Sequence, residues 1–342
     1  MVFEYYSGFS NAVNKLAIHG PGEYDKNMHV QVSDRDDTGF AGELGSHSLL
    51  TRFRDLEIHH LHGTTSPNCM KEIGRIREQE FRREGGGSGK SEDIDSFDTG
   101  EHCYQLIAYD PQWREIVSCY RYIHHGMISP GLLKGSTPAG RLFRFSPRFM
   151  DGYSRGTVEL GRSVVNRKAR RRVMGLFAVW SGLGALINEI PGLKWFFGKL
   201  TVYPRVPQEL RKRLFGFWSR YYPGDRSIIC PVKEHAVDED AEYFRDYPET
   251  ISSDEAFQRF SREMTEAGHP VPPLMKSYLG VSREIESFGT AENGHFGSVF
   301  ETAILLPVES ILPSARGRFI DGYSSENDLL TQLYGNKEQL KT

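Results

Sequence analysis

The stretch TVELGRSVVNRKARRR, Thr157 to Arg172, decides how the rest of the sequence is interpreted. Its part from Val158 to Val165 predicts a buried strand, yet it contains Glu159 and Arg162. A structural strand tends to avoid charges on its inner face, because an unpaired buried charge is costly. The two residues are three apart, so we expect them on opposite faces unless a β-bulge intervenes. The stretch therefore predicts a strand that takes part in chemistry, followed by a run of cations.

The composition is that of an ordinary globular protein. The chain has 342 residues, of which 38% are hydrophobic and 25% charged, with room for one large domain or two small ones. The formal net charge of −3 gives no overall attraction for polyanions, so no nucleic-acid partner is expected. Four scattered cysteines form no paired motif, which favours a reducing cytosol.

Two segments bear on localisation. The first residues, MVFEYYSGFS, lack the basic start and apolar core of a signal peptide. The longest nearly apolar run, Val173 to Ile187, has 15 residues, whereas a membrane span needs about 20. The sequence therefore predicts a cytoplasmic protein, with peripheral contact at the inner membrane face left open.

The hydrophobic pattern predicts one α/β domain. Residues 1–45 are a polar extension of uncertain order, 46–320 form the domain, and 321–342 are a polar tail. Alternating strands and helices in this order predict a mixed central sheet. The expected strands are 53–62, 102–109, 116–124, 158–165, 195–203, 283–288 and 299–306, and the expected helices are 68–83, 172–189, 207–222 and 252–267.

Several familiar motifs fail on inspection. GGGSGKS resembles a phosphate-binding loop, but Glu84 stands where the first glycine of that motif is required. The segment GGGSGKSEDIDSFD therefore predicts a mobile, acidic loop. The pairs His59-His60 and His124-His125 cannot chelate through both rings on a strand, so no metal is expected. No GxSxG elbow of a serine hydrolase is present.

The aromatic groups at 195–197 and 214–222 leave three interpretations open. They are typical of a plain core, of an apolar tunnel, or of a membrane-facing surface. Arg211, Lys212 and Arg213 precede the second group and would suit anionic headgroups in the third case.

Several short motifs recur in a fixed order around the opening stretch. They are Arg77 and Phe81 in RxxxF, Asp95 and Asp98 in DxxD, Arg121 in a strand, Phe145, and ELGRS with Glu159 and Arg162. This order resembles the acyl-homoserine-lactone synthases. It resembles more closely the hemolysin-like GNAT proteins that acylate lipid amines, the ornithine-lipid and glycine-lipid types. The similarity covers roughly residues 70–165 and resumes at PPLMKSYLG (272–280) and AENGHFGSVFETAILL (291–306).

The resemblance implies a fold and an activity. The fold would be GNAT-like, with strands splayed apart at the acyl-donor site. The protein would move a fatty acyl group to the amine of an amino acid or lyso-aminolipid. The donor would be acyl carrier protein, through its phosphopantetheine thioester, or acyl-CoA, with no permanently bound cofactor. A short-chain acetyl-CoA transferase and a membrane-associated, hemolysin-like binding protein without catalysis are the alternatives.

The resemblance also implies roles for individual residues. Glu159 would be the base, and backbone N–H groups near Val164 and Val165 would meet the oxyanion. The donor phosphate would lie near Arg172 to Gly175, although RVMGLF ends in Phe177 where GNAT proteins usually carry Gly or Ala. An ion-pair network over the site would consist of Arg77, Asp95, Asp98, Arg121 and Arg162. Arg170 and Arg171 would contact the carrier protein. Phe81 and Phe145 would help to bind the donor.

Overall fold

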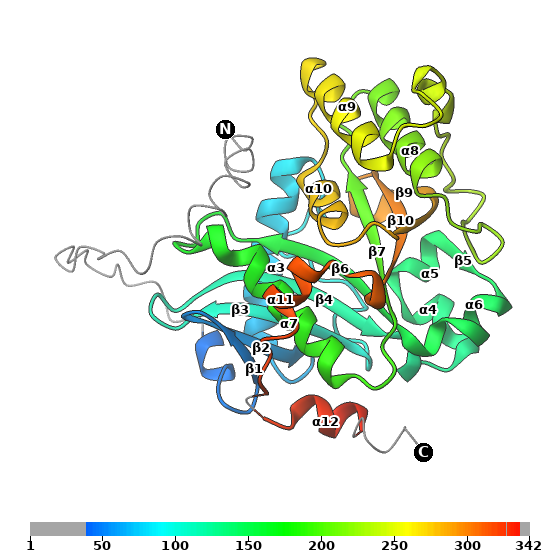
Figure 1. Ribbon diagram of the computed structural model, residues 1–342. Helices are drawn as coiled ribbons and strands as arrows, with labels where there is room; N and C mark the ends of the chain where they lie inside the picture. Colours follow the sequence, from blue (N-terminus) through cyan, green and yellow to red (C-terminus); the bar gives the residue numbers. More distant parts are fainter. Residues whose placement is uncertain (1–38, 326, 336–342) are drawn as a thin grey trace. The chain divides into compact units, whose positions relative to one another are not determined.

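The computed structural model describes residues 39–325 and 327–335, which are built around one large sheet (Figure 1). Its eight strands follow the order β1-β2-β3-β4-β6-β7-β10-β9. The predicted mixed sheet flanked by helices is confirmed. The strands are β1 (Leu49–Phe53), β2 (Leu56–His62), β3 (Cys103–Asp110), β4 (Glu115–His124), β6 (Thr157–Val165), β7 (Trp195–Val202), β9 (Glu286–Asn293) and β10 (Val299–Pro307), with β5 (Phe143–Phe145) and β8 (Ile229–Pro231) forming a separate ribbon.

The contact between β6 and β7 is the one parallel pairing in the described sheet, and it is short. It joins residues 157–159 to residues 195–197. Beyond these residues β6 continues beside β4, and β7 continues beside β10. The two strands therefore part at residues 160 and 198. This opening in the middle of the sheet is the splay that the resemblance predicted.

Helices cover both faces of the sheet. On α3, Ile76 belongs to one apolar cluster with Ile107 of β3, whereas Val179 of α7 belongs to another with Leu106. Since Leu106 and Ile107 are neighbours on one strand, α3 and α7 lie on opposite faces. The helices are α3 (Pro67–Glu84), α4 (Leu133–Ser136), α5 (Pro138–Leu142), α6 (Pro147–Gly152), α7 (Gly175–Glu189), α8 (Gln208–Tyr221), α9 (Ser253–Glu266), α10 (Pro273–Leu279), α11 (Pro313–Phe319) and α12 (Leu329–Tyr334).

The segment between β7 and β9 forms an aromatic layer at one end of the sheet, where Figure 1 shows α8 and α9 together. Phe217 of α8 stacks on Phe260 of α9 at a centroid distance of 5.2 Å. Phe244 packs against the same pair at 5.8 and 5.3 Å. All three rings are buried, so among the three interpretations of this helix the structure favours core. Within the described residues, no helix is both long and apolar enough to cross a bilayer.

Differences from the predicted elements arise where turns and packing override the local pattern. The strand expected at 53–62 is divided, because Arg54 adopts a φ of 56° and turns β1 back onto β2. Helix α10 was not predicted, and β9 runs to Asn293 instead of ending at 288.

Segments on both sides of the predicted domain pack against it. Glu43 accepts hydrogen bonds from the backbone N–H groups of Asn68 and Cys69 and so caps α3, whose own Ser66 makes no side-chain cap bond. Helix α12 lies within the predicted polar tail, but Leu330 is buried and Tyr334 is hydrogen-bonded to Tyr122 at 3.0 Å. Most of the predicted 1–45 extension lies outside the described residues.

Candidate functional site

A β-bulge in β6 decides which way its charged side chains point. Glu159 lies opposite Ile123 of β4 and Gly161 opposite Arg121, and the register then skips one residue. Arg162 lies at the skip with a φ of 54°, which is uncommon for a residue other than glycine. The extra residue breaks the alternation, so Arg162 shares a face with Glu159. The default expectation of opposite faces is wrong, and the bulge named as its exception is present.

Arg77 forms the buried centre of an ion-pair network under this face. Its guanidinium donates to Asp98 Oδ1 at 2.9 Å and to Gln105 Oε1 at 2.7 Å, and both members of the ion pair have fully buried side chains. Gln105 closes the triangle by donating to Asp98 at 3.1 Å. Burial alone would raise the pKa of Asp98, but Arg77 and Arg121 hold it well below its usual value. Asp98 is therefore a fixed anion at neutral pH.

The network continues from Asp98 to the bulge. Arg121 lies 2.8 Å from Asp95 Oδ1 and 3.2 Å from Asp98 Oδ1. Arg162 lies 2.8 Å from Asp93 Oδ2 and 3.5 Å from Asp95 Oδ2. The structure thus brings together all five residues that the sequence assigned to this network and adds Asp93. The acidic loop after α3 is tied to β4 and β6 by these pairs.

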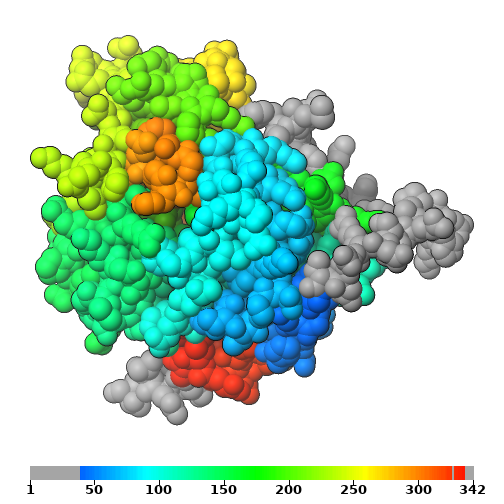
Figure 2. Space-filling view, turned by 180° about the vertical axis from the view of Figure 1, so that it is seen from behind, coloured from blue at the N-terminus to red at the C-terminus, as the bar shows by residue number. Residues whose placement is uncertain are grey.

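The glycine-rich loop is ordered by a carboxylate of its own chain. Glu78 accepts hydrogen bonds from the backbone N–H groups of Ser88 and Gly89 at 2.8 and 3.0 Å, and from the Ser88 hydroxyl. Figure 2 shows this region (cyan) beside the turn between β9 and β10 (orange), where a Cβ on Gly86 would lie 3.4 Å from Val299. The amides that a P-loop would offer to phosphate are therefore occupied by Glu78.

Glu159 lies at the apex of the splay, as the last β6 residue paired with β7. Its carboxylate is buried and accepts the Ala139 backbone N–H at 2.9 Å, and His125 Nε2 lies 3.1 Å from its other oxygen. Burial alone would raise the pKa of Glu159, but the hydrogen bond from His125, the charge of Lys199 and the Ala139 amide lower it. Glu159 is therefore an anion held in one orientation.

Lys199 spans the opening between the two strands. It lies on β7, two residues past the last pair with β6, and its Nζ is 3.9 Å from Glu159 Oε1. The same Nζ is 3.9 Å from Glu301 Oε2 on β10. Glu301 in turn accepts a hydrogen bond from Asn293 at 3.0 Å. A row of buried charges thus crosses the splay from β6 to β10.

On the other face of the sheet, the splay is closed by two tyrosines. Tyr278 of α10 lies in the PPLMKSYL segment, and its hydroxyl is 2.7 Å from the Tyr120 hydroxyl on β4. A Cβ on Gly198, the first β7 residue past the pairing, would lie 3.3 Å from the Tyr278 oxygen. The PPLMKSYL segment therefore supplies a side chain at the opening itself.

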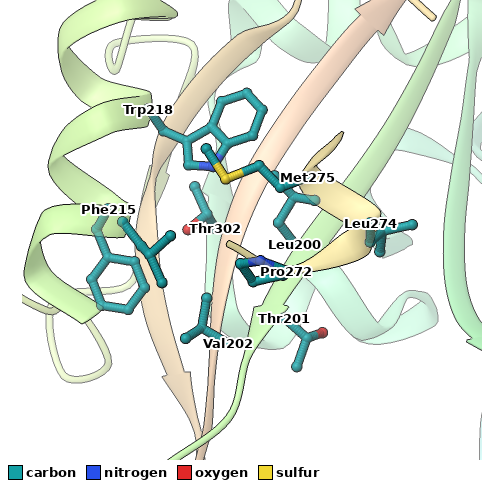
Figure 3. Close-up of a pocket in the computed structure, with 10 residues that line it drawn as sticks. Leu200, Thr201, Val202, Phe215, Trp218, Pro272, Leu274, Met275 and Thr302 are labelled. Atoms are coloured by element: carbon teal, nitrogen blue, oxygen red, sulfur yellow. The ribbon is translucent and has the colours of Figure 1, made fainter. Parts of the chain in front are cut away.

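An apolar cavity adjoins the open arm of β7 on that same face (Figure 3). Leu200 and Val202 point to it from β7, Phe215 and Trp218 from α8, and Met275 from α10. Its volume is about 10 Å³, close to the space of one water molecule. The lining is apolar, as the tunnel interpretation of residues 214–222 requires, but in this structure the cavity is too small for an alkyl chain.

The other predicted binding residues flank the polar row. Phe81 packs edge-on against Phe296 at 5.0 Å, and the Arg162 guanidinium covers the Phe296 ring at 3.8 Å. Phe145 lies 5.9 Å from the His125 ring. Val164 and Val165 pair with β4 beyond the bulge, on the part of β6 that has left β7.

The cations predicted to contact the carrier protein are engaged within the protein. Arg170 stacks on Trp113 in the β3–β4 turn at 3.7 Å, and Arg171 lies 3.2 Å from Asp110 at the end of β3. Gly175 starts α7 and packs tightly, since an added Cβ would lie 3.0 Å from Val165. Arg172 lies just before it, with Nη1 3.5 Å from the Ala169 carbonyl.

A second group of cations lines an open polar cleft on the α3 side. Its volume is about 430 Å³. The lining residues are Glu78, Gln79, Arg82, Arg83, Lys90, Ser91 and Lys168. Arg82 and Arg83 are ion-paired with Glu78 and Glu80, so Lys90 and Lys168 are the lining cations for which the described residues show no ion pair.

The sequence interpretation missed Asp93, Gln105, His125, Lys199 and Glu301. Lys199 carried a weak signal, because it lies two residues after Phe197 and so on the same strand face as a core ring. Its partners could not be inferred, because they depend on β7 lying between β6 and β10.

Comparisons with known proteins identify the chain. Residues 76–180 match the family described as Acetyltransferase (GNAT) domain. The chain is also 36% identical over 286 residues to the glycine N(alpha)-acyltransferase of Phocaeicola vulgatus, covering 79% of this chain and 86% of that relative. This chain belongs to the GNAT N-acyltransferases. The glycine N(alpha)-acyltransferase of Bacteroides thetaiotaomicron is 35% identical over 286 residues, covering 80% and 84%.

The predicted fold class and enzyme class of this acyltransferase are thus confirmed, and the interpretation as a binding protein without catalysis is set aside. Among solved structures, the CoA-dependent acyl-homoserine lactone synthase MesI is 15% identical, with 81% of this chain and 95% of that chain covered and a TM-score of 0.33. The synthase BjaI with MTA is 12% identical, with 82% and 90% covered and a TM-score of 0.37. With scores this low, neither likeness bears on function.

Proposed function

We propose that this acyltransferase moves a fatty acyl group from a thioester to the amine of glycine, giving an N-acyl amino acid. The observation that carries the proposal is the buried Glu159 carboxylate at the apex of the splay, facing Lys199 across the opening. The two curated relatives are named for acylation of glycine, which supports this acceptor over ornithine. A lyso-aminolipid with a free amine is the broader form of the same acceptor class.

The chemistry needs a proton acceptor near the attacking nitrogen. The amine attacks the thioester carbonyl carbon, the C–N bond forms, and the nitrogen must then lose a proton before the C–S bond breaks. We assign that proton to Glu159, directly or through a water. Its lowered pKa makes it too weak a base to deprotonate the ammonium form of the acceptor, so the attacking species is the neutral amine, which loses its ammonium proton to solvent. The nitrogen becomes far more acidic once it is bonded to the carbonyl carbon, so a fixed carboxylate suffices at that stage.

The open edge of β6 suits the developing oxyanion. Beyond Glu159, β6 is paired with β4 on one side, and the described pairing with β7 has ended. Backbone N–H groups that point from this edge into the splay are available to a ligand. We assign the oxyanion to this edge near Val164 and Val165, where such donors cost no reorganisation.

The acyl chain would extend from the splay into the apolar cavity of Figure 3. The cavity would have to widen by movement of side chains on α8 and α10. Burial of the chain would contribute about 0.8 kcal/mol per CH₂ group, which favours long donors. Phe177 supports this over an acetyl donor, because the position usually held by Gly or Ala stacks on Phe319 at 5.9 Å.

The donor's carrier remains acyl carrier protein or CoA. The basic cleft formed by Arg82, Arg83, Lys90 and Lys168 supports an acidic carrier, because all four of these residues are exposed. The phosphate site expected at Arg172 to Gly175 stays a prediction. Contact with a membrane surface also stays a prediction.

One assay separates these possibilities. The purified protein is incubated with acyl carrier protein or CoA thioesters from acetyl to palmitoyl, together with each amino acid and a set of lyso-aminolipids, and product masses are recorded. Long-chain N-acylglycine is the expected product. Turnover confined to acetyl-CoA would instead establish the short-chain alternative, and products restricted to lyso-lipids would exclude the free amino acid as acceptor.

A further inference from the structure

Lys199 has an unusual environment for a buried cation. Its side chain is only 8% exposed, yet its Nζ lies 3.9 Å from each of two carboxylates, beyond hydrogen-bond distance from both. Within residues 39–325 and 327–335, this Nζ makes no hydrogen bond. A buried ammonium normally commits its donors, because leaving them unpaired is costly. Lys199 Nζ is not among the fully buried unpaired atoms of the described residues, so its three N–H donors reach open space and can bind a ligand or water there.

The position of Lys199 limits where that partner can lie. The residue is on the open arm of β7, two positions past the last pair with β6, and Glu301 lies on the same face of the neighbouring β10. Glu159, Lys199 and Glu301 thus alternate in charge across the opening where the thioester would be placed. A ligand at Lys199 would be directly beside the proposed base.

The charge pattern fits a zwitterion. An α-amino acid carries an anion and a cation on neighbouring carbons, separated by about the distance that separates Lys199 from its two carboxylates. Arg162, the other cation near the splay, is already engaged by Asp93 and Asp95. Lys199 is therefore the cation beside Glu159 that has no ion pair shorter than 3.9 Å, so it can receive an acceptor carboxylate while Glu159 faces the acceptor nitrogen.

We propose that Lys199 binds the α-carboxylate of the acceptor and that Glu301, held by Asn293, positions the Lys199 ammonium. This inference rests on the proposed acylation of an amine and narrows the acceptor to a free α-amino acid. An amine whose neighbouring carboxyl is amidated or esterified lacks the anion that Lys199 requires. The enzyme would thereby reject most lipid amines.

The first test needs no variant. With a saturating long-chain donor, kcat/KM is measured for glycine, glycinamide and glycine methyl ester. A charged hydrogen bond lost from a buried site predicts that the two analogues fall by about 10- to 100-fold, mainly through KM. Equal use of glycine and glycinamide would overturn the proposal. Such a result would leave acyl transfer intact, whereas absence of product with every amine would refute the proposed function itself.

The second test assigns the effect to Lys199. Lys199→Met should lower kcat/KM for glycine far more than for glycinamide, so that the preference for glycine collapses. Lys199→Arg should restore part of it, and Lys276→Met, on the exposed face of α10, serves as the matched control. An equal loss for both substrates would show a structural role and contradict the proposal.

The variant leaves Glu159 and Glu301 without their shared cation, so its folding must be monitored by thermal melting. If Lys199→Met is unfolded, Lys199→Met combined with Glu301→Gln removes one of the two stranded charges. Retained discrimination between glycine and glycinamide in that folded double variant would exclude Lys199 as the anchor.

Discussion

Two groups of charges lie on the same face of the sheet, and they are built differently. In the group around Arg77, Arg121 and Asp98, ion pairs are as short as 2.8–3.2 Å, and Gln105 adds hydrogen bonds to Arg77 and Asp98. In the group around Lys199, the two ion pairs are both 3.9 Å long. The first group is joined by short, buried contacts that leave Arg77 Nε as one unpaired donor, whereas Lys199 has no contact of hydrogen-bond length in the described residues.

This difference teaches how to separate scaffold from site among buried charges. The Arg77 group ties α3 and its acidic loop to β3 and β4, so its short bonds stabilise the fold. The Lys199 group spans strands that have stopped pairing, so its members face an opening. Mutation of either group is expected to abolish enzyme activity. Measurements of stability and of kinetics are therefore both needed to distinguish a structural role from a role in the reaction.

The largest expected effect is on folding. Arg77→Met should lower the free energy of unfolding by about 3–5 kcal/mol, because it removes one of the two guanidinium groups that balance the buried Asp98 anion and leaves the Gln105 carbonyl without its donor. Chemical denaturation measures this loss. Arg148→Met is the matched control, since the Arg148–Asp225 pair is 67% and 47% exposed and should contribute less than about 1 kcal/mol. Similar losses for the two variants would contradict a scaffold role for Arg77.

Glu159→Gln should act on turnover more than on stability. We expect kcat to fall by about 10²- to 10⁴-fold, with a melting temperature near that of the wild type, because the amide is isosteric but cannot accept the proton. Glu266→Gln on the exposed face of α9 is the control. A rate near wild type at neutral pH would remove Glu159 as the base.

The pH dependence of the wild type gives an independent check. Since the folded-state pKa of Glu159 is lowered, its anionic form persists as pH falls to the ordinary glutamate value of about 4.3. In the pH profile of kcat, the loss of activity on the acidic side that we assign to Glu159 should therefore occur below a pH of about 4.3. The stability contributed by the Glu159 anion is likewise present above it and lost as pH falls through the lower folded-state pKa. A limb near pH 6 would point to another group.

The sequence predicted most residues of the Arg77 group, but it did not predict the Lys199 group. Helical spacing placed Arg77 and Phe81 on one helix, and the resemblance placed Asp95, Asp98 and Arg121 around it. These are near neighbours in α3, its loop and the β3–β4 hairpin, so local patterns suffice. The bulge at Arg162 could not be predicted, because a positive φ at arginine is imposed by tertiary contacts.

Lys199 and Glu301 could not be predicted from the sequence for a different reason. They are far from Glu159 along the chain and meet it only because β7 crosses to lie beside β6 and β10 returns beside β7. The cation run after β6 misled in the opposite direction. Its outer cations, Arg170 and Arg171, were predicted to contact the carrier protein, yet their guanidinium groups already contact Trp113 in the β3–β4 turn and Asp110 at the end of β3.

Filling the apolar cavity on the opposite face of the sheet is expected to have a smaller effect on kcat/KM. Leu274 lines the cavity and is half-buried, so Leu274→Trp should fill the cavity without unfolding α10. The loss of two or three buried methylenes predicts a roughly 10- to 50-fold lower kcat/KM for palmitoyl donors and little change for short ones. Lys276→Trp, exposed on the same helix, is the control. Equal losses at every chain length would place the acyl chain elsewhere.

The smallest effect distinguishes the two cationic regions. Lys168→Met removes an exposed cation from the basic cleft and should raise KM for an acyl carrier protein donor by about two- to fivefold, less so at high salt. Arg170→Met should leave that KM unchanged and cost about 0.5–1 kcal/mol of stability, because its guanidinium stacks on Trp113. If Arg170→Met raised this KM and Lys168→Met did not, the carrier protein would bind at the run of cations before α7. In that case Arg170 must leave Trp113 when the donor binds, and the tryptophan fluorescence of the wild type should change on titration with the carrier protein.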